Sequence, residues 1–334
     1  MRAIVINGKL DLELTELPTP EPGPGQVRLR IAFAGICGSD LHYYYDGANG
    51  AFVVREPLVP GHEVSGTVDL DPAGELAPGT PVTVHPATFG EPQKGLADRP
   101  HLWPRGAYLG SASTWPHTQG GMSEYLLVHR AMVRPLPASL PLRRAALAEP
   151  LAVGLHGLRL AGGVAGRTVL VAGSGPIGLL TAAAALATDA AHVTATDVLP
   201  GPLERARALG VHRTLDVSRE EVPAEAFDVV LECSGVAASI NTGFLAARRA
   251  GVYVQLGMVP DAPGAINLAP VISKELTVHG SFRFSDEIDA AVALLDADPR
   301  IEQVVTHELP ADRALEAFAA ARDSEVSGKV LIAL

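Results

Sequence analysis

The sequence predicts an α/β protein of two domains, one mostly β with long loops and one built on a doubly wound parallel sheet. A chain of 334 residues is long for a single hydrophobic core. Strand-like segments bounded by Gly and Pro fill the first part of the chain, whereas buried strand runs alternate with helical segments from about residue 151. We therefore expect two domains, with a boundary near residue 151.

The first domain is expected to consist of strands joined by long loops. A Pro- and Gly-rich connector at residues 18–26 separates the first strand-like segment from the next. Residues 88–115 show little periodicity, and a loop of that length is unusual unless it is functional. The expected strands lie at residues 1–14, 27–36, 62–70, 80–86 and 123–130.

The second domain is expected to alternate strands and helices at short spacing, which is typical of βαβ units in a parallel sheet. Its strands are expected at residues 167–172, 192–197, 227–232 and 251–257, and its helices at residues 178–187, 202–210 and 236–249. Two amphipathic helices, 287–297 and 311–322, and a terminal strand, 329–334, complete the chain.

Composition excludes several classes of partner. The net charge of −11 would repel nucleic-acid phosphates and anionic lipids. The longest apolar run, which starts at Ile177, is too short to span a bilayer. Residues 1–14 alternate like a strand and lack a signal-peptide core, and two cysteines cannot form a disulfide framework. We expect a cytoplasmic protein that binds neither nucleic acid nor membranes.

A glycine-rich turn predicts dinucleotide binding. Gly173, Gly175 and Gly178 form a GxGxxG pattern between a strand and a helix, where the glycines allow a tight turn and close approach of a pyrophosphate to the helix N-terminus. Asp197 ends the next strand, 19 residues after Gly178, where a carboxylate binds ribose hydroxyls and repels a 2′-phosphate. The first cation after Asp197 is Arg205, on the following helix. We therefore expect NAD rather than NADP.

Three polar segments of the first domain could hold a metal ion. They contain Cys37, the pair His62–Glu63, and Glu149. A thiolate, an imidazole and carboxylates form a reasonable ligand set for Zn²⁺ with one position left open. Taken singly, each has an ordinary structural explanation, because lone cysteines are usually core residues and a glutamate before a proline often starts a helix.

With the dinucleotide turn, these segments resemble the zinc-dependent medium-chain dehydrogenase family over essentially the whole chain. The motifs that carry the resemblance are GICGSDLHYY, PGHEVSG, EPLAVGLHG, GSGPIG and GSFRF. The resemblance implies a GroES-like catalytic domain of residues 1–150 and 285–334, and a Rossmann domain of residues 151–284 that binds NAD. It implies a catalytic zinc surrounded by Cys37, His62 and Glu63, with Glu149 at the edge of the metal. It also implies that Asp40 fixes the ring of His62.

The polyol branch of the family is the most similar, and it implies further roles. Ser39 and His42 would relay the hydroxyl proton to solvent, with Glu149 assisting catalysis. Tyr43, Glu149 and Arg283 would contact the substrate. The residues expected to line the cofactor are Gly173, Gly175, Ile177, Gly178, Asp197, Leu256, Gly257, Met258, Ser281 and Phe282.

The substrate expected from the resemblance is the aldonate L-idonate, oxidised reversibly at its C5 hydroxyl to 5-keto-D-gluconate. Its carboxylate needs a donor, for which Arg283 is the candidate, with Ser111, Ser113 and His117 as possible helpers. A guanidinium also binds neutral hydroxyls, so sorbitol or xylitol is an alternative. A zinc-free quinone reductase and a non-catalytic NAD-binding protein are further alternatives. Cys37 counts against both.

One stretch departs from the family. Many members hold a structural zinc with four cysteines, but residues 87–110 contain none, and the second cysteine, Cys233, ends a predicted strand where burial is expected. We expect one zinc per chain and a lobe held by packing and subunit contacts, with Trp103 as an anchor. His85 and His101 are expected to be ordinary loop histidines. By resemblance, a homodimer or homotetramer would pair through residues 251–257 and 276–282.

Overall fold

The computed structural model describes residues 1–260 and 262–334, which form two compact units. The first unit comprises Met1–Glu149, Leu295–Asp323 and Lys329–Leu334, and the second comprises Pro150–Leu294 and Ser324–Gly328. Compactness therefore groups residues 285–294 with the second unit, whereas the sequence analysis grouped them with the first.

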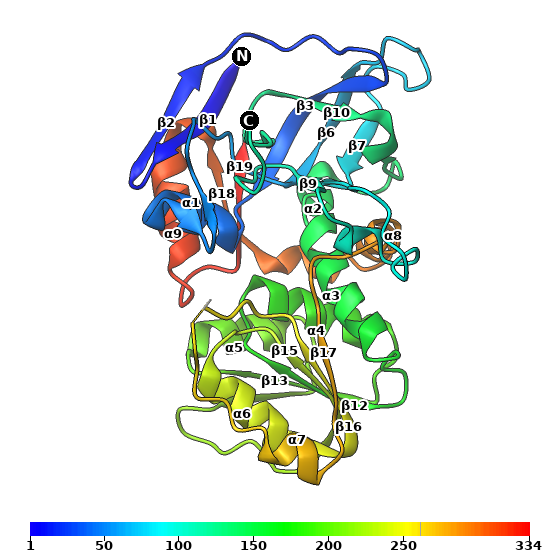
Figure 1. Cartoon of the computed structure of the whole chain (residues 1–334), viewed down its shortest axis with the longest axis vertical. Helices are drawn as coiled ribbons and strands as arrows, with labels where there is room; N and C mark the ends of the chain where they lie inside the picture. Colours follow the sequence, from blue (N-terminus) through cyan, green and yellow to red (C-terminus); the bar gives the residue numbers. More distant parts are fainter. Residues whose placement is uncertain (261) are drawn as a thin grey trace. The chain divides into compact units, whose positions relative to one another are not determined.

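The first unit is mostly β, with a seven-stranded sheet in the order β11-β7-β6-β3-β19-β18 and β10 paired with β3 (Figure 1). The neighbouring strands are antiparallel except for β18 and β19. The sheet strands are β3 (Gln26–Gly35), β6 (Glu63–Leu70), β7 (Pro81–Val84), β10 (Tyr125–His129), β11 (Val133–Pro135), β18 (Val305–Pro310) and β19 (Lys329–Ala333).

Smaller elements surround this sheet. A hairpin of β1 (Arg2–Gly8) and β2 (Asp11–Glu16) buries four consecutive apolar residues of β1, residues 3–6. The first half of β3 instead alternates buried with more exposed residues, and both strands contribute to one hydrophobic core. The remaining elements are β4 (Ala48–Asn49) with β5 (Phe52–Val53), β8 (Ala87–Thr88) with β9 (Ala107–Tyr108), α1 (Gly38–Asp46), α2 (Leu142–Ala145) and α9 (Ala314–Arg322).

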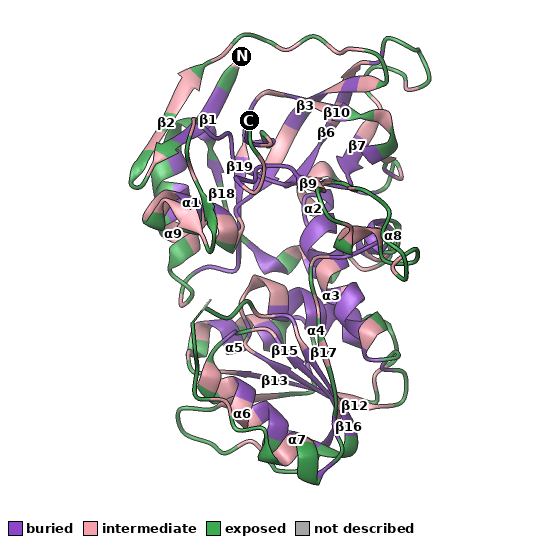
Figure 2. Ribbon diagram, in the orientation of Figure 1, coloured by how far each residue is buried: buried purple, intermediate pink, exposed green. Residues whose placement is uncertain are grey.

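The second unit contains a six-stranded parallel sheet in the order β14-β13-β12-β15-β16-β17, which confirms the predicted doubly wound architecture (Figure 1). Its central strands are buried, as Figure 2 shows. The strands are β12 (Thr168–Ala172), β13 (His192–Asp197), β14 (Arg213–Asp216), β15 (Phe227–Glu232), β16 (Ala247–Gln255) and β17 (Thr277–Gly280). The helices are α4 (Pro176–Ala187), α5 (Pro200–Ala208), α6 (Ala237–Ala246) and α7 (Ala269–Ser273), and α3 (Ala148–Leu160) and α8 (Ile288–Ala297) each cross a unit boundary.

Several observed elements differ from the sequence expectations, and two of these lie in the second unit. The helix expected to run to residue 249 ends at Ala246, because residues 247–250 already belong to β16. Strand β14 was not expected. It is four residues long and packs at the edge of the sheet against β13.

Strand β17 forms the other edge of this sheet and is largely exposed. Such an edge offers unpaired backbone groups to another chain, but the expected homo-oligomer stays a prediction. No helix of the described residues has the length and apolar character needed to cross a membrane.

Candidate metal site and cofactor turn

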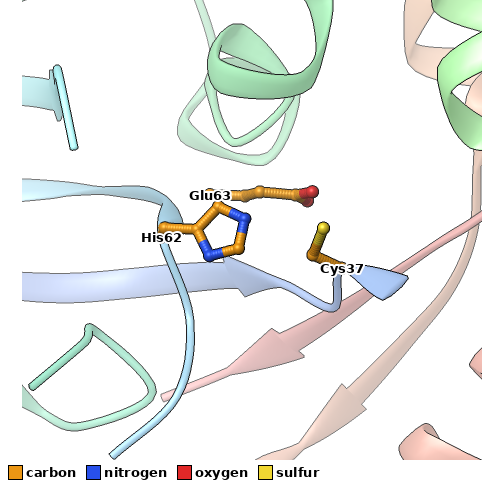
Figure 3. Close-up of side chains that lie close together, drawn as sticks. All are labelled: Cys37, His62 and Glu63. Carbon is orange, nitrogen blue, oxygen red and sulfur yellow. The ribbon is translucent and has the colours of Figure 1, made fainter. Parts of the chain in front are cut away.

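The three candidate ligands Cys37, His62 and Glu63 come from the ends of two paired strands. β3 ends at Gly35 and β6 begins at Glu63, and these two residues are partners in the antiparallel ladder. The donor atoms of Cys37, His62 and Glu63 all lie within 4.8 Å of one another. Figure 3 shows the three side chains gathered in one place. The structure therefore unites three of the four predicted ligands.

The carboxylate of Glu63 is buried, and its two oxygens have different surroundings. Oε1 accepts a hydrogen bond from Nζ of Lys329 at 2.7 Å, and the same ammonium donates to the carbonyl of Ile36 at 3.0 Å. Oε2 has no hydrogen-bond partner among the described residues. A Cβ at Gly35 would lie 2.1 Å from Oε2, so glycine at this position leaves room for the carboxylate.

His62 is buried in a strongly negative environment. Burial by itself lowers the pKa of His62, but the charges of Cys37, Glu149 and Asp40 outweigh burial and raise it to about 10. Tyr108 packs edge-on against the imidazole with ring centroids 5.3 Å apart. These anions stabilise positive charge at His62, which is the electrostatic condition that also favours a bound cation.

Glu149 lies in the first turn of α3, outside the set of mutually close donor atoms. Its Oε1 accepts a 2.5 Å hydrogen bond from the hydroxyl of Tyr108, which in turn packs against His62. Burial raises the pKa of Glu149, although the charge of His62 opposes this. Its roles in metal binding and catalysis stay predictions.

Asp40 binds backbone groups instead of the ring of His62. Its Oδ2 accepts the N–H of Cys37 at 2.9 Å, and its Oδ1 accepts the N–H of Gly61 at 3.2 Å. The carboxylate therefore fixes the two segments that carry the metal ligands, and it caps the first turn of α1. The expected hydrogen bond to His62 is replaced by an electrostatic interaction.

The other predicted residues of α1 differ in exposure. Ser39 is half-buried, whereas His42 is exposed and its Nδ1 lies 2.9 Å from Oδ2 of Asp46. Tyr43 is buried, and its hydroxyl lies 3.3 Å from Oγ of Ser111. No hydrogen bond links Ser39 to His42 among the described residues, so the proton relay stays a prediction.

The donor set fits a zinc ion. A thiolate, an imidazole and a carboxylate are ligands that Zn²⁺ accepts, and the buried, unpartnered Oε2 of Glu63 is the atom that a metal would satisfy. A divalent ion together with Lys329 would offset the negative charge contributed by Cys37, Asp40, Glu63 and Glu149. Burial lowers the pKa of Lys329, but Glu63 and Cys37 outweigh this and raise it, so the ammonium stays charged.

The glycine-rich turn lies between β12 and α4, as expected. Gly173 has φ +92°, which favours glycine, and a Cβ on Gly178 would lie 1.9 Å from the carbonyl oxygen of Gly173. Gly175 is different, because it has φ −67° and a Cβ there would meet no atom within 4 Å. The fold itself requires glycine at the first and third positions, whereas at Gly175 it leaves open space next to the N-terminus of α4.

Asp197 ends β13, and its carboxylate is bound to the turn. Oδ2 accepts the N–H of Ser174 at 2.9 Å, and Oδ1 accepts the N–H of Val198 at 2.8 Å. Arg205 does not turn back toward Asp197. Its guanidinium donates to the carbonyls of Ser324 and Glu325, at 2.6 and 3.1 Å.

The remaining predicted cofactor residues follow the carboxyl ends of parallel strands. Leu256, Gly257 and Met258 follow β16, and Ser281 and Phe282 follow β17. The carboxyl ends of the strands are where open α/β sheets bind ligands. The buried Oγ of Ser281 has no hydrogen-bond partner among the described residues.

Arg283 belongs to the second unit, directly after this segment. Its backbone has φ +53°, and its guanidinium lies 4.8 Å from the ring centroid of Phe282. The role of Arg283 in substrate binding stays a prediction.

The loop between β8 and β9 is tied together by hydrogen bonds. Nε1 of Trp103 donates to the carbonyl of Leu96 at 2.7 Å, and the N–H of Glu91 donates to the carbonyl of Pro104 at 3.0 Å. Within the described part of the chain, this loop contains no group of three close metal donors. The thiol of Cys233 is surrounded by β15 and α4, and burial raises its pKa.

Sequence reasoning missed two residues of the metal region, Lys329 and Tyr108. Lys329 opens an otherwise apolar strand, and a charged residue in such a run is a signal that could have been noticed. Tyr108 lies in a loop without periodicity and gave no such signal.

Comparisons with known proteins give two matching family profiles. The profile described as the alcohol dehydrogenase GroES-like domain matches residues 23–138, and the profile described as zinc-binding dehydrogenase matches residues 176–297. Together they extend over more than half of the chain, and they confirm the predicted combination of GroES-like and Rossmann domains.

The similar proteins include several sugar-alcohol dehydrogenases. Sorbitol dehydrogenase of Macaca fascicularis is 35% identical over 334 residues, which is 95% of this chain and 91% of the relative. L-idonate 5-dehydrogenase (NAD(P)(+)) of Escherichia coli is 34% identical over 300 residues, or 88% of this chain and 87% of the relative. The crystal structure of Escherichia coli L-idonate 5-dehydrogenase superposes with a TM-score of 0.94 at 32% identity, covering 100% of this chain and 98% of that chain.

Proposed function

This chain belongs to the zinc-dependent medium-chain dehydrogenase family as an alcohol or polyol dehydrogenase, and on that premise we propose that it oxidises the C5 hydroxyl of L-idonate. The reaction would yield 5-keto-D-gluconate, run reversibly and use NAD. The observation that carries the proposal is the group of Cys37, His62 and Glu63, with donor atoms within 4.8 Å of one another and one carboxylate oxygen left unpartnered.

Cys37, His62 and Glu63 are the residues that would hold one zinc ion per chain. When bound there, zinc supplies a Lewis acid that favours loss of the proton of a substrate hydroxyl, and NAD accepts the hydride. Lys329 holds Oε1 of Glu63 and so orients the other oxygen. Asp40 links the backbone segments around Cys37 and Gly61 by accepting a hydrogen bond from each.

The remaining site residues would handle the proton and the substrate. Ser39 is half-buried and His42 is exposed, so the helix offers a route from the interior to solvent. The hydroxyl of the buried Tyr43 is held by Ser111 and by the N–H of Ala112, and we propose Tyr43 as a substrate contact. Arg283 is the further residue that we propose to contact the substrate.

The preference for NAD is supported by the residues that follow β13. A carboxylate at Asp197 disfavours a 2′-phosphate, and the guanidinium of Arg205 is engaged by two backbone carbonyls. A cation that could bind the extra phosphate of NADP is therefore not supplied by Arg205.

A neutral polyol is the second candidate substrate, because sorbitol dehydrogenases are as similar in sequence as L-idonate 5-dehydrogenase. The test measures kcat/KM for L-idonate, sorbitol and xylitol with NAD and with NADP, together with the zinc content. We expect L-idonate with NAD to give the highest value and one zinc per chain.

Three results would count against the proposal. Faster oxidation of sorbitol than of L-idonate would indicate that the substrate is a neutral polyol and not L-idonate. Activity that survives complete chelation would indicate zinc-free chemistry instead. Two tightly bound zinc ions per chain would refute the single-metal assignment.

A further inference from the structure

We propose that Arg55 recognises the carboxylate of an acidic sugar substrate, and that a small cavity beside Tyr43 receives this end of the molecule. The inference rests on the proposed function and extends it, because it names the residue that would distinguish an aldonate from a neutral polyol. Four observations support the inference. They are the position of the cavity next to Tyr43, the positive charge that Arg55 gives the cavity, the lack of a partner for the Arg55 guanidinium among the described residues, and the hydrogen bonds that hold the backbone of Arg55.

The cavity has a volume of about 150 Å³ and is formed by two segments, residues 51–55 and 112–117. It lies beside the buried Tyr43, whose hydroxyl accepts the N–H of Ala112 at 3.1 Å, and Ala112 lines the cavity. Ser111, which also contacts Tyr43, lies 3.0 Å from Ser113 of the lining (Oγ to Oγ). A substrate held by Tyr43 would therefore have this cavity next to it.

The same loop connects the cavity to the metal group. Tyr108 packs against His62 and donates to Glu149, and five residues later Ser113 lines the cavity. On the other side, Tyr43 belongs to the helix that begins directly after Cys37. Both connections lie within the first unit, so the cavity and the metal group belong to the same compact unit.

Arg55 gives the cavity a positive charge. No acidic side chain lines it among the described residues, and the other polar side-chain groups of the lining are hydroxyls, the indole N–H of Trp115 and the imidazole of His117. Both ring nitrogens of His117 face backbone groups, because Nε2 accepts the N–H of Arg55 and Nδ1 lies 3.0 Å from the carbonyl oxygen of Thr114. The guanidinium of Arg55 is therefore the charged lining group that a ligand can reach.

The Arg55 side chain forms no ion pair or hydrogen bond within the part of the chain that the structure describes, and it is exposed. The nearest acidic neighbour in sequence, Glu56, accepts the N–H of His117 with Oε1 at 2.5 Å. An arginine without a protein partner at a polar cavity is available to a ligand anion. A guanidinium binds a carboxylate through two parallel hydrogen bonds.

The backbone that carries Arg55 is held in place. The N–H of Arg55 donates to His117 at 2.9 Å, the N–H of Val54 donates to the carbonyl of Gly47 at 3.0 Å, and Glu56 binds His117. His117 therefore acts on Arg55 and does not itself contact the carboxylate. Such support fixes the direction in which the guanidinium can reach.

The test compares an acid and a neutral substrate in Arg55→Met and Arg55→Lys. Kinetics with L-idonate and with sorbitol are measured in the zinc-loaded full-length enzyme with NAD. Charged hydrogen bonds of this kind are worth roughly 10- to 100-fold in binding. We expect Arg55→Met to lower kcat/KM for L-idonate by about that factor, mainly through KM, and to change the value for sorbitol by less than about 3-fold.

The Lys variant should recover part of the loss, since it keeps the charge but not the two parallel hydrogen bonds. Arg105→Met is the matched control, because Arg105 is an exposed arginine of the same unit that pairs with Glu91 at 2.8 Å. It should leave both substrates unaffected. If Arg55→Met leaves the ratio of kcat/KM for L-idonate to that for sorbitol unchanged, the inference is overturned. An equal loss on both substrates would then indicate a structural role for Arg55.

Failure of the proposed function has a different signature. If the wild-type enzyme oxidises sorbitol but not L-idonate, the proposed substrate is wrong, and L-idonate is then tested as an inhibitor of sorbitol oxidation. If neither is oxidised, binding of L-idonate is measured by calorimetry in the presence of NADH. In both cases the inference is supported if Arg55→Met binds L-idonate about 10-fold or more weakly than the wild type. Equal affinity of the wild type and Arg55→Met for L-idonate would overturn the inference. If Arg283→Met, and not Arg55→Met, lowers acid selectivity, Arg283 binds the carboxylate and the inference about Arg55 is overturned.

Discussion

The metal group and the cofactor turn are built in opposite ways. The metal group consists of side chains from distant parts of the chain, since Glu63 and its partner Lys329 are 266 residues apart. The cofactor turn lies within residues 173–178, where the backbone at Gly173 and Gly178 leaves no room for a side chain. A backbone site is specified by local sequence, whereas a side-chain site exists only after the strands have paired.

The two regions also treat charge differently. The metal group gathers buried ionisable side chains whose pKa values are moved by one another. The cofactor turn offers polar N–H groups at a helix N-terminus and contains no ionisable side chain of its own. Substitutions should therefore separate the two sites, and the following experiments test this separation.

The largest effect is expected for Cys37→Ser. Loss of the thiolate should lower kcat/KM by roughly 1,000-fold or more, because a Lewis-acid metal contributes several kcal/mol and each 1.36 kcal/mol is tenfold in rate. Zinc content should fall with activity, while NADH affinity, measured by fluorescence titration, should stay within about 2-fold of the wild type. Cys233→Ser is the control and should retain zinc. Loss of NADH binding in Cys37→Ser would break the proposed separation of the sites.

A smaller effect, on stability, is expected for a buried carboxylate of the second unit. Glu287 binds Nδ1 of His156 at 2.8 Å, and although burial raises the pKa of Glu287, His156 and backbone N–H groups outweigh it and lower the pKa to about 2. Because the folded pKa is below the unfolded value of about 4.3, its stabilisation is complete above that value and disappears as the pH falls toward 2.

Glu287→Gln should therefore be destabilised by at most about 3 kcal/mol at pH 7 and by less at pH 3. Urea unfolding of both proteins at the two pH values measures the difference. The zinc content at pH 7 should be unchanged, since neither residue belongs to the metal group. A destabilisation of the same size at both pH values would show that the carboxylate charge is not the cause.

The smallest effect is expected for Gly175→Ala. The added methyl group meets no atom of the protein, so the melting temperature should not change, yet it should weaken NADH binding by about 10-fold if a pyrophosphate approaches the turn. Gly178→Ala is the contrasting variant, because its methyl group clashes with Gly173 and should cost about 1–3 kcal/mol of stability. Normal NADH affinity in Gly175→Ala would refute its role in cofactor binding.

The sequence predicted those parts of the fold that depend on local pattern better than those that depend on contacts between distant segments. Strands β12, β13 and β15 are short apolar runs bounded by turns, and their positions and parallel pairing were predictable. Helix α1 was not expected, because GSDLHYYYD has little amphipathic periodicity. It forms where Asp40 accepts the N–H of Cys37. Strand β14 is too short for a clear pattern.

The candidate site was predictable only in part. The resemblance to a family supplied Cys37, His62 and Glu63, and the structure unites them. It did not supply Lys329 or the proposed role of Arg55. The ion pair between Lys329 and Glu63 joins residues far apart in the sequence, and the lack of a partner for the Arg55 guanidinium among the described residues is visible only in the folded protein. The hydrogen bonds of Asp40 to the N–H groups of Cys37 and Gly61 were not expected for the same reason, since they depend on where two backbone segments meet.

The bond between Lys329 and Glu63 has a consequence for biosynthesis. On the ribosome, the residues around Cys37 and His62 emerge well before the strand that carries Lys329, and the whole second unit is translated in between. Until β19 joins the sheet, Glu63 lacks its buried ammonium partner. Closing a loop of this length is entropically costly and comes late in folding. Metal loading of a nascent chain would therefore meet a site of different charge from that of the finished enzyme.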